Sequence, residues 1–227
     1  MICTLCNVNN SIRRRRSEGC LRPMTGERGR KTKFNLRYSR KLALPRLYRR
    51  MCAGTDAGTF SGSGSAGTVS LKQFENPANP QAHYETTGPE IYRDLGSTID
   101  YVVAGAGSGG TYTGILRYLK EQKPTIRGVL ADPVGSTIGG GEHADYDIEG
   151  ISNDFIPQTM DISLVDQVIK ITDDDAFSGS RLLASREGIF GGALSAALKL
   201  IRSGATGRIV VVLPDRGDRY FSKNLYE

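Results

Sequence analysis

Residues 105–111 have the composition of an anion-binding loop. Their sequence is Gly-Ala-Gly-Ser-Gly-Gly-Thr, and it directly follows an apolar segment at 99–104. Glycines let a backbone approach an anion closely, and successive N–H groups at a helix N-terminus bind negative charge with help from the helix dipole. Ser108 and Thr111 add hydroxyl donors. The residues alone leave two interpretations open, a phosphate-binding loop or a tight strand-to-helix turn without a ligand.

Two common nucleotide-binding motifs fit this segment poorly. A P-loop requires a Gly-Lys-Ser/Thr sequence, and none follows here. A dinucleotide-binding fingerprint requires an acidic residue at the end of the next strand, where Asp132 is the nearest candidate. Pro133 follows Asp132 immediately, which is the wrong setting for that role. Neither motif therefore explains the loop.

The strands and helices that must position this loop alternate along the chain. Apolar segments predict strands, and amphipathic segments with acidic starts or glycine ends predict helices. The expected strands cover residues 99–104, 126–131, 165–171 and 209–213, and the expected helices cover 88–95, 111–120, 173–186 and 193–202. This alternation is typical of an α/β fold, an open parallel sheet with helices on both faces. Ligands of such sheets bind at the carboxyl ends of the strands, where the loop lies.

Charge divides the chain into unequal parts. Between residues 11 and 50 there are 15 Lys and Arg but only two acids, a balance of +13, which leaves −7 for the rest of a chain whose total is +6. Residues 53–68 are rich in Gly, Ser, Thr and Ala, the composition of a flexible linker. We therefore expect a basic, disordered tail at 1–52, a linker at 53–68 and the α/β domain at 69–227.

The basic tail raises the question of three partners or locations, namely nucleic acid, the mitochondrion and a membrane. Its Arg and Lys residues would attract nucleic-acid phosphates, but no aromatic interleaving or nucleic-acid-binding motif accompanies them, so nucleic acid is not the expected partner. An Arg-rich, acid-poor N-terminus also fits a mitochondrial transit peptide, although Pro23, Gly26 and Gly29 interrupt the helix that such a peptide forms. No apolar run is long enough for a transmembrane helix. A cytoplasmic location is expected, with the mitochondrion as the alternative.

The cysteines all precede the α/β part. Cys3 and Cys6 form a C-x-x-C, which is half of a zinc site or a redox pair. A zinc site needs a second pair of ligands, and Cys20 and Cys52 each stand alone. The expectation is reduced thiols and no metal site.

Four motifs together resemble the cysteine synthase and cystathionine β-synthase family of fold-type II pyridoxal-phosphate (PLP) enzymes. In chain order they lie at residues 73–91, at 104–111 with Gly114, at 149–157 and at 213–223. They cover roughly 160 of the 227 residues and keep the family's order and spacing. The resemblance implies a tryptophan synthase β-like PLP fold that is incomplete, because only the family's C-terminal portion is matched.

The resemblance also implies the cofactor and the site residues. PLP is the electron sink of a β-replacement, in which an amino-acid substrate loses its α-proton and a β-substituent before a thiol or sulfide adds. The residues implied to hold the cofactor phosphate are Gly107, Ser108, Gly109, Gly110 and Thr111. Gln73 is implied to lie near the substrate carboxylate, and Glu149, Gly150 and Ile151 to close over the bound intermediate.

Parts of the family's catalytic apparatus have no counterpart in this chain. The family needs a lysine that forms the Schiff base with PLP, set in a Ser/Val-x-Lys-Asp-Arg-like context, and no lysine here has that context. The Asn-containing loop that holds the cofactor ring is also missing. After Ile189 the family carries a Gly-Ser-Ser-Gly-type turn that faces the pyridine nitrogen, whereas this chain continues Phe-Gly-Gly-Ala. No catalytic residue can therefore be assigned.

The expected function follows from both the resemblance and the departures. The chain is expected to be a member or fragment of a PLP-dependent β-replacement enzyme of cysteine biosynthesis, a transferase or lyase most like cysteine synthase, which makes cysteine and acetate from O-acetylserine and sulfide. Catalysis is expected to be impaired. The alternatives are cystathionine β-synthase-type activity on serine and homocysteine, or a non-catalytic binding remnant. The expected ligand is a small amino acid, and a homodimer is expected because the family is commonly dimeric.

Overall fold

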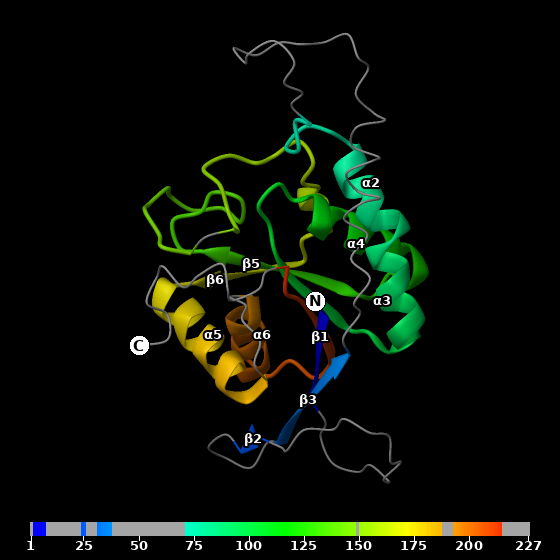
Figure 1. Ribbon diagram of the computed structural model, residues 1–227, viewed down its shortest axis with the longest axis vertical. Helices are drawn as coiled ribbons and strands as arrows, with labels where there is room; N and C mark the ends of the chain where they lie inside the picture. Colours follow the sequence, from blue (N-terminus) through cyan, green and yellow to red (C-terminus); the bar gives the residue numbers. More distant parts are fainter. Residues whose placement is uncertain are drawn as a thin grey trace.

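The computed structural model of the chain describes a three-layered α/β unit (Figure 1). The described residues are 2–7, 24–25, 31–37, 71–148, 150–187 and 193–214. The side chains are described from residue 71 onward, except for those of 183–187.

The sheet contains seven strands in the order β2-β3-β1-β7-β4-β5-β6. They are β1 (Ile2–Asn7), β2 (Met24–Thr25), β3 (Lys31–Arg37), β4 (Tyr101–Gly105), β5 (Arg127–Pro133), β6 (Gln167–Ile171) and β7 (Gly207–Val212). Strands β7, β4, β5 and β6 pair in parallel, whereas β1 is antiparallel to both β3 and β7. The open parallel sheet predicted from the sequence is confirmed.

Helices cover both faces of the parallel strands, as predicted (Figure 1). The α-helices are α2 (Ala78–Glu85), α3 (Thr87–Leu95), α4 (Gly110–Gln122), α5 (Asp173–Glu187) and α6 (Ala193–Arg202), and short 3-10 helices span η1 (Gly96–Thr98) and η2 (Ile162–Leu164). Helices α2, α3 and α4 lie on one side of the sheet, and α5 and α6 lie on the other (Figure 1). None of the helices in the described part is long and apolar enough to span a membrane.

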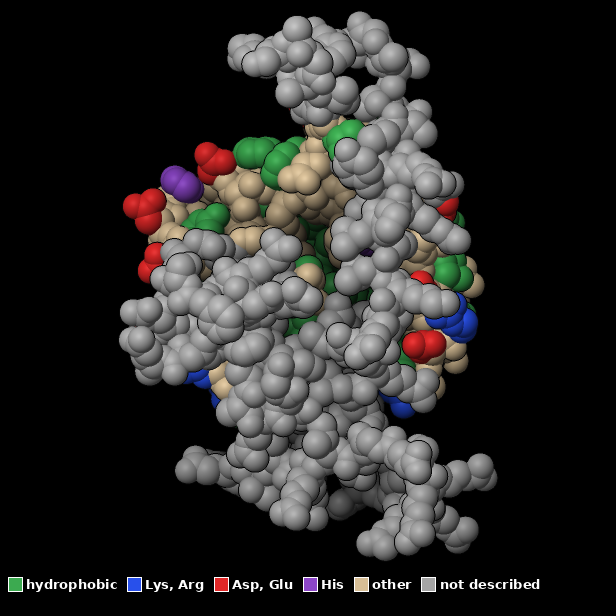
Figure 2. Space-filling model, viewed as in Figure 1, with side chains coloured by type: hydrophobic (Ala, Val, Ile, Leu, Met, Phe, Trp, Pro, Cys, Tyr) green, Lys and Arg blue, Asp and Glu red, His purple; other side chains and the backbone are tan. Residues whose placement is uncertain are grey.

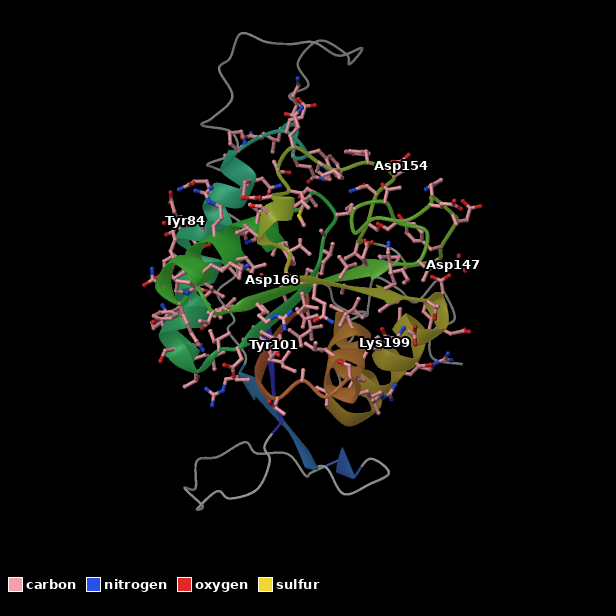
Figure 3. All side chains as sticks on the ribbon, turned by 180° about the vertical axis from the view of Figure 1, so that it is seen from behind. Tyr84, Tyr101, Asp147, Asp154, Asp166 and Lys199 are labelled. Carbon is pink, nitrogen blue, oxygen red and sulfur yellow. The ribbon has the colours of Figure 1, made fainter. Side chains whose placement is uncertain are left out.

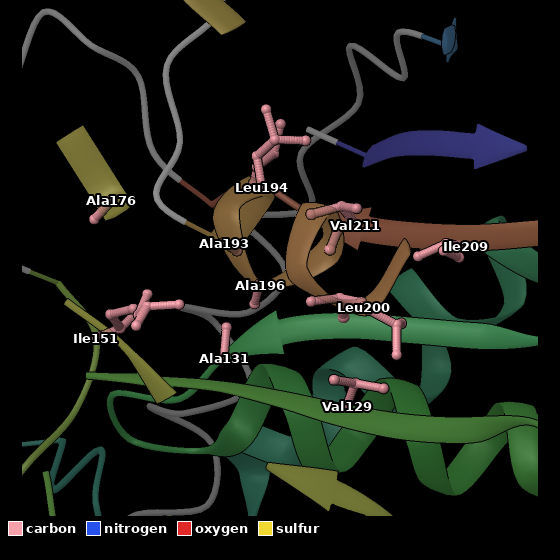
Figure 4. Packing of buried hydrophobic residues seen from close by; sticks show 14 of the residues in the cluster. Val129, Ala131, Ile151, Ala176, Ala193, Leu194, Ala196, Leu200, Ile209 and Val211 are labelled. Atoms are coloured by element: carbon pink, nitrogen blue, oxygen red, sulfur yellow. The ribbon is translucent and has the colours of Figure 1, made fainter. Parts of the chain in front are cut away.

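Alternate strand residues form two separate hydrophobic cores. Successive side chains of a strand point to opposite faces, so each buried strand must be apolar on both. Val103, Val129 and Val211 pack with α5 and α6 (Figure 4), whereas Val102, Leu130 and Val210 pack with α3 and α4. The continuous apolar runs in the sequence therefore reflect burial on both faces.

Helix α4 is the central element beneath the loop. Ile115, Leu116 and Leu119 are fully buried, and they fix the helix against the sheet. A side chain at Gly114 would overlap the carbonyl oxygen of Pro80, so this glycine allows α2 to pack closely on α4. The position of α4 in turn fixes the position of the loop at its N-terminus.

A carboxylate at the start of β6 joins α4 to the sheet. Asp166 Oδ2 accepts hydrogen bonds from Lys120 Nζ at 2.7 Å and from the Gly128 backbone N–H at 2.5 Å. Figure 3 shows Asp166 between the helical layer and the strands. These bonds tie α4 to β5.

Short parts of the N-terminal segment are described as strands, and the predicted low-order tail at 1–52 stays a prediction. The structure describes strands β1, β2 and β3 within residues 1–52, and β1 places Ile2 opposite Val212 of β7. Ile2–Asn7 carries no charged residue and pairs with the edge of β7 opposite β4, and an exposed strand edge readily pairs with another chain segment. The linker at 53–68 lies outside the described residues.

Helix α2 was also absent from the predicted elements. Its segment contains Pro77 and Pro80, which are typical of a turn. Both prolines lie at or before the first helical turn, where a backbone N–H has no intrahelical partner, so neither breaks the helix.

Candidate functional site

The predicted anion-binding loop joins β4 to α4 at the carboxyl edge of the parallel strands. Helix α4 begins at Gly110, and Gly109 precedes it with a φ of +80°, a conformation that favours glycine. A Cβ atom at Gly109 would lie 2.5 Å from Met160 Cβ. The loop therefore requires glycine both for its conformation and for its close packing.

The carbonyl groups of this loop are held by the segment that follows it in space, residues 150–160. Ser152 N–H donates to Ala106 O at 2.6 Å, and Asn153 Nδ2 donates to Gly107 O at 2.6 Å. Thr159 Oγ1 donates to Ser108 O at 2.5 Å. These contacts fix the orientation of the peptide groups in the loop.

The backbone N–H groups of the same loop, unlike its carbonyl groups, form no hydrogen bond with the described part of the chain. Among the described residues, none accepts a hydrogen bond from an N–H of residues 107–111. The first N–H groups of a helix lack intrahelical partners and carry the positive end of the helix dipole. The loop thus presents unbonded donors, which is the arrangement that binds a phosphate.

A cavity of about 380 Å³ lies against this loop. Its lining includes seven of the nine residues predicted for the site, namely Gln73, Gly107, Ser108, Gly109, Thr111, Gly150 and Ile151. Gly110 is not part of the lining, because it packs against the Asn79 side chain. Glu149 lies outside the described residues. The structure therefore brings segments 73, 107–111 and 150–151 to one cavity.

The two hydroxyl groups of the loop have partners that the sequence did not reveal. Asn79 Nδ2 donates to Ser108 Oγ at 2.8 Å and also to Gln73 O at 2.8 Å. Because Ser108 Oγ accepts this bond, its own proton remains available as a donor. Asn79 is buried, so it links Gln73 to the loop in a fixed geometry.

His83 connects the second hydroxyl to helix α3. Its Nε2 lies 3.0 Å from Thr111 Oγ1, and its Nδ1 lies 2.9 Å from Thr87 Oγ1. Burial lowers the pKa of His83 to about 4, so the ring is neutral at pH 7 and has one donor nitrogen and one acceptor nitrogen. With the proton on Nε2, the Thr111 hydroxyl accepts from His83 and is left to donate into the cavity.

Residues predicted to contact the substrate are among those that line the cavity. Gln73 is exposed, and the neighbouring Phe74 packs against Phe155 with ring centroids 5.7 Å apart. Ile151 is buried directly over Gly105, where a Cβ atom would overlap its side chain. Ile151 therefore contributes an apolar part of the lining beside the strand end.

Charged side chains are absent from the described lining of the cavity. Any anion there must be held by backbone dipoles and hydroxyl groups. Glu142, Asp145 and Asp147 lie exposed on the loop after β5, and Figure 2 shows acidic side chains on the surface of this face of the molecule. The described residues contain no group of three His, Cys, Asp or Glu side chains that could hold a metal ion.

Comparisons with known proteins agree with this fold. The family described as "Pyridoxal-phosphate dependent enzyme" matches residues 55–215, and the chain belongs to this family. The O-acetylserine dependent cystathionine beta-synthase of Bacillus subtilis (strain 168) is 44% identical over 161 residues, which are 68% of this chain and 52% of the relative. Cysteine synthase A of Escherichia coli (strain K12) is 43% identical over 175 residues, 69% of this chain and 53% of the relative.

Solved structures give the same result. The crystal structure of O-acetylserine dependent cystathionine beta-synthase from Helicobacter pylori has a TM-score of 0.62 and 39% identity, and the match covers 68% of this chain and 53% of that one. O-ureido-L-serine synthase has a TM-score of 0.64 and 36% identity, with 69% and 52% covered. The chain spans about half the length of the curated relatives it matches.

The residues that line the cavity fit the phosphate group of PLP, the cofactor that the family uses. Residues 107–111 offer unbonded N–H groups and hydroxyls for its phosphate. Lysine, which would hold the other end, is not found in the described lining.

Proposed function

We propose that this chain binds the phosphate of PLP and supplies part of the site of a β-replacement enzyme of the cysteine synthase type. The observation that carries the proposal is the loop at 107–111, whose carbonyl groups are bonded to the protein while its N–H groups are left for a ligand. The likeness to O-acetylserine-dependent relatives supports the choice of reaction.

Each group of residues has a separate task in this proposal. Gly107 and Gly109 allow the close approach of the phosphate, Gly110 at the start of α4 contributes its backbone N–H, and Ser108 and Thr111 donate from their hydroxyl groups. When bound, the cofactor supplies the electron sink for chemistry at the amino-acid substrate.

The substrate-side residues orient and enclose the amino acid. Gln73 at the mouth is suited to bind its carboxylate, and Gly150 and Ile151, with Glu149, cover it. Exclusion of water strengthens the interactions of the loop dipoles, since charges and dipoles attract more strongly in a medium of low dielectric constant.

We also propose that this chain is impaired in catalysis. The base that removes the α-proton in this family is the lysine that anchors the cofactor, and the described lining contains none. General acid–base catalysis typically contributes about 10²- to 10⁴-fold to a rate. The absence of such a lysine favours the second candidate function, a non-catalytic PLP-binding or amino-acid-binding protein. A homodimer and a cytoplasmic location, with the mitochondrion as the alternative, belong to the same proposal.

The test is a cysteine-formation assay on the full chain with O-acetylserine, sulfide and added PLP, compared with free PLP alone. Equal rates are expected. Lys72 adjoins Gln73 and is the nearest lysine in sequence to a cavity residue, so Lys72→Ala is the matched control. Turnover clearly above that of free PLP, and lost in Lys72→Ala, would show that Lys72 serves as the cofactor lysine and would refute the impairment.

A further inference from the structure

A single side-chain amide joins two of the segments that line the cavity. Asn79 Nδ2 donates to Gln73 O at 2.8 Å and to Ser108 Oγ at 2.8 Å. Because an amide nitrogen carries two hydrogens, both of its donors are used. Gln73 belongs to the segment before α2 and Ser108 to the anion-binding loop, and both residues line the cavity. The two segments therefore share one donor group.

The packing around Asn79 leaves its side chain little freedom. The residue is only 6% exposed and lies in the first turn of α2, where its N–H donates to Asn76 O at 3.0 Å. A Cβ atom at Gly110 would overlap Asn79 Oδ1, so the amide fills the space that this glycine leaves at the start of α4. The amide is thus fixed by α2 and α4 together, and it holds Gln73 and Ser108 in a set arrangement.

Thr159 supports the same arrangement from a third segment. Its N–H donates to Phe74 O at 3.2 Å, and its Oγ1 donates to Ser108 O at 2.5 Å. Thr159 Oγ1 lies 3.5 Å from Gln73 O, and its single proton is used by the shorter bond to Ser108. Asn79 therefore makes the short side-chain bond to the Gln73 carbonyl, and it is the group through which the position of Gln73 depends on Ser108.

The turn before α2 does not need this bond for its own closure. Asn76 Oδ1 accepts from the Ala78 N–H at 2.9 Å, and Asn76 Nδ2 donates to Leu71 O at 3.2 Å. Asparagine commonly closes a turn by such local bonds. Asn79 instead reaches a distant loop, so its bonds serve the site rather than the turn.

The shared donor links events at the loop to events at Gln73. An anion held by residues 107–111 restrains the loop, which includes Ser108. Through the Asn79 amide the same restraint reaches the Gln73 backbone. A second ligand that binds a segment already restrained loses less conformational entropy, so its affinity is higher.

We propose that Asn79 is a positioning residue that couples two ligands of the site: an anion held by residues 107–111 strengthens, through Ser108 and Asn79, the binding of an amino-acid carboxylate at Gln73. This inference rests on the proposed function, which assigns the two ligands, and adds to it the coupling between them. Because coupling between binding sites is reciprocal, the amino acid strengthens anion binding by the same factor.

The test measures the binding of L-serine to the full chain by calorimetry, without phosphate and with saturating inorganic phosphate. L-Serine carries the carboxylate of the expected substrates, and inorganic phosphate represents the phosphate group of PLP, so no covalent step joins the two ligands. The wild type should bind L-serine about fivefold or more tightly when phosphate is present.

Two variants remove the connection at its two ends. Asn79→Asp fills the same space beside Gly110 but, as a carboxylate, donates to neither Gln73 O nor Ser108 Oγ. Ser108→Ala removes the acceptor in the loop and leaves Asn79 unchanged. In both variants the affinity for L-serine should be the same with and without saturating phosphate.

The matched control is Ser195→Ala in α6, on the opposite side of the sheet. It also removes a buried side-chain hydrogen bond, which runs from Ser195 Oγ to Asp175 O. The unfolding temperature of each variant is measured without ligand. Ser195→Ala should unfold at a lower temperature than the wild type and keep the wild-type effect of phosphate on L-serine affinity.

The remaining outcomes distinguish this inference from the proposed function. A wild type that binds inorganic phosphate but binds L-serine equally with and without it, or not at all, would overturn the coupling and leave the phosphate site in place. An effect of phosphate that persists in Asn79→Asp and Ser108→Ala, or that is also lost in Ser195→Ala, would overturn the role of Asn79. A wild type that binds neither inorganic phosphate nor pyridoxine 5′-phosphate would overturn both proposals.

Discussion

The buried histidine beside the loop should make the stability of the protein depend on pH. Burial lowers the pKa of His83 in the folded protein from 6.5 to about 4. The unfolded chain therefore binds a proton at this residue more readily than the folded protein does. Stability from neutral His83 is fully present above pH 6.5, and it is lost as the pH falls from 6.5 toward 4.

The size of this effect follows from the two pKa values. The difference between 6.5 and about 4 corresponds to about 3 kcal/mol of unfolding free energy once the pH is below both. At pH 5, where the unfolded chain is largely protonated at this residue and the folded protein is not, the loss is about 2 kcal/mol. A loss of this size is a large fraction of the stability of a typical domain.

The assay is urea unfolding followed by circular dichroism at pH 7.5 and pH 5. The matched variant is His83→Gln, whose side-chain amide reaches the place of Nε2 and can still donate to Thr111, but which does not titrate. The wild type should lose about 2 kcal/mol more than the variant between the two pH values. An equal loss in both proteins would refute the assignment of a neutral, buried His83.

Three further predictions concern packing and boundaries. Gly114→Ala should lower the unfolding free energy by about 1–3 kcal/mol or more, because its Cβ would overlap the Pro80 carbonyl; urea unfolding measures this. Lys170→Met should cost about 3–5 kcal/mol, because Asp132, only 2% exposed, would lose its partner at 2.6 Å; adding Asp132→Asn should recover part of the loss in the same assay. Limited trypsin digestion should leave a resistant fragment that begins near Val69, and protection of the whole chain would contradict that boundary.

The sequence was most informative where a structural property is local. Strand β4 and helix α4 were predicted within about two residues at each end, because apolar runs and helical periodicity depend on neighbouring residues. The glycine loop was found for the same reason, since its donors lie on consecutive residues. Helix α2 was missed because two prolines, which are tolerated in a first turn, resemble a turn in sequence.

The sequence was less informative where a property depends on distant segments. Asn153 contacts Gly107 across 46 positions, and His83 contacts Thr111 across 28. Neither pair has a spacing that marks it as a contact. The link that Asn79 makes between Gln73 and Ser108 likewise depends on the folded arrangement of α2 and the loop.

The N-terminal strands lie in a segment whose composition is mixed. Charge and glycine content predict disorder before residue 68, and most of that segment lies outside the described residues. The strand that pairs with β7, Ile2–Asn7, carries no charged residue. The sequence of β3 alternates Lys31, Lys33 and Arg37 with less polar residues, a period of two that is compatible with a strand. The boundary between tail and domain stays a prediction.

The central claim is that residues 107–111 hold the phosphate of the cofactor, and the most direct test compares pyridoxine 5′-phosphate with pyridoxine. Neither compound has an aldehyde, so neither reacts with surface lysines, and the two differ only in the phosphate. Calorimetry on the wild type should show reversible binding of the phosphorylated compound and none of the other. Gly109→Asp forces a side chain against Met160 at a φ of +80° and adds negative charge to the loop, so it should abolish binding. Thr111→Val, which removes one hydroxyl without a large change in volume, should weaken it. Equal binding of both compounds, or undiminished binding by both variants, would contradict the account.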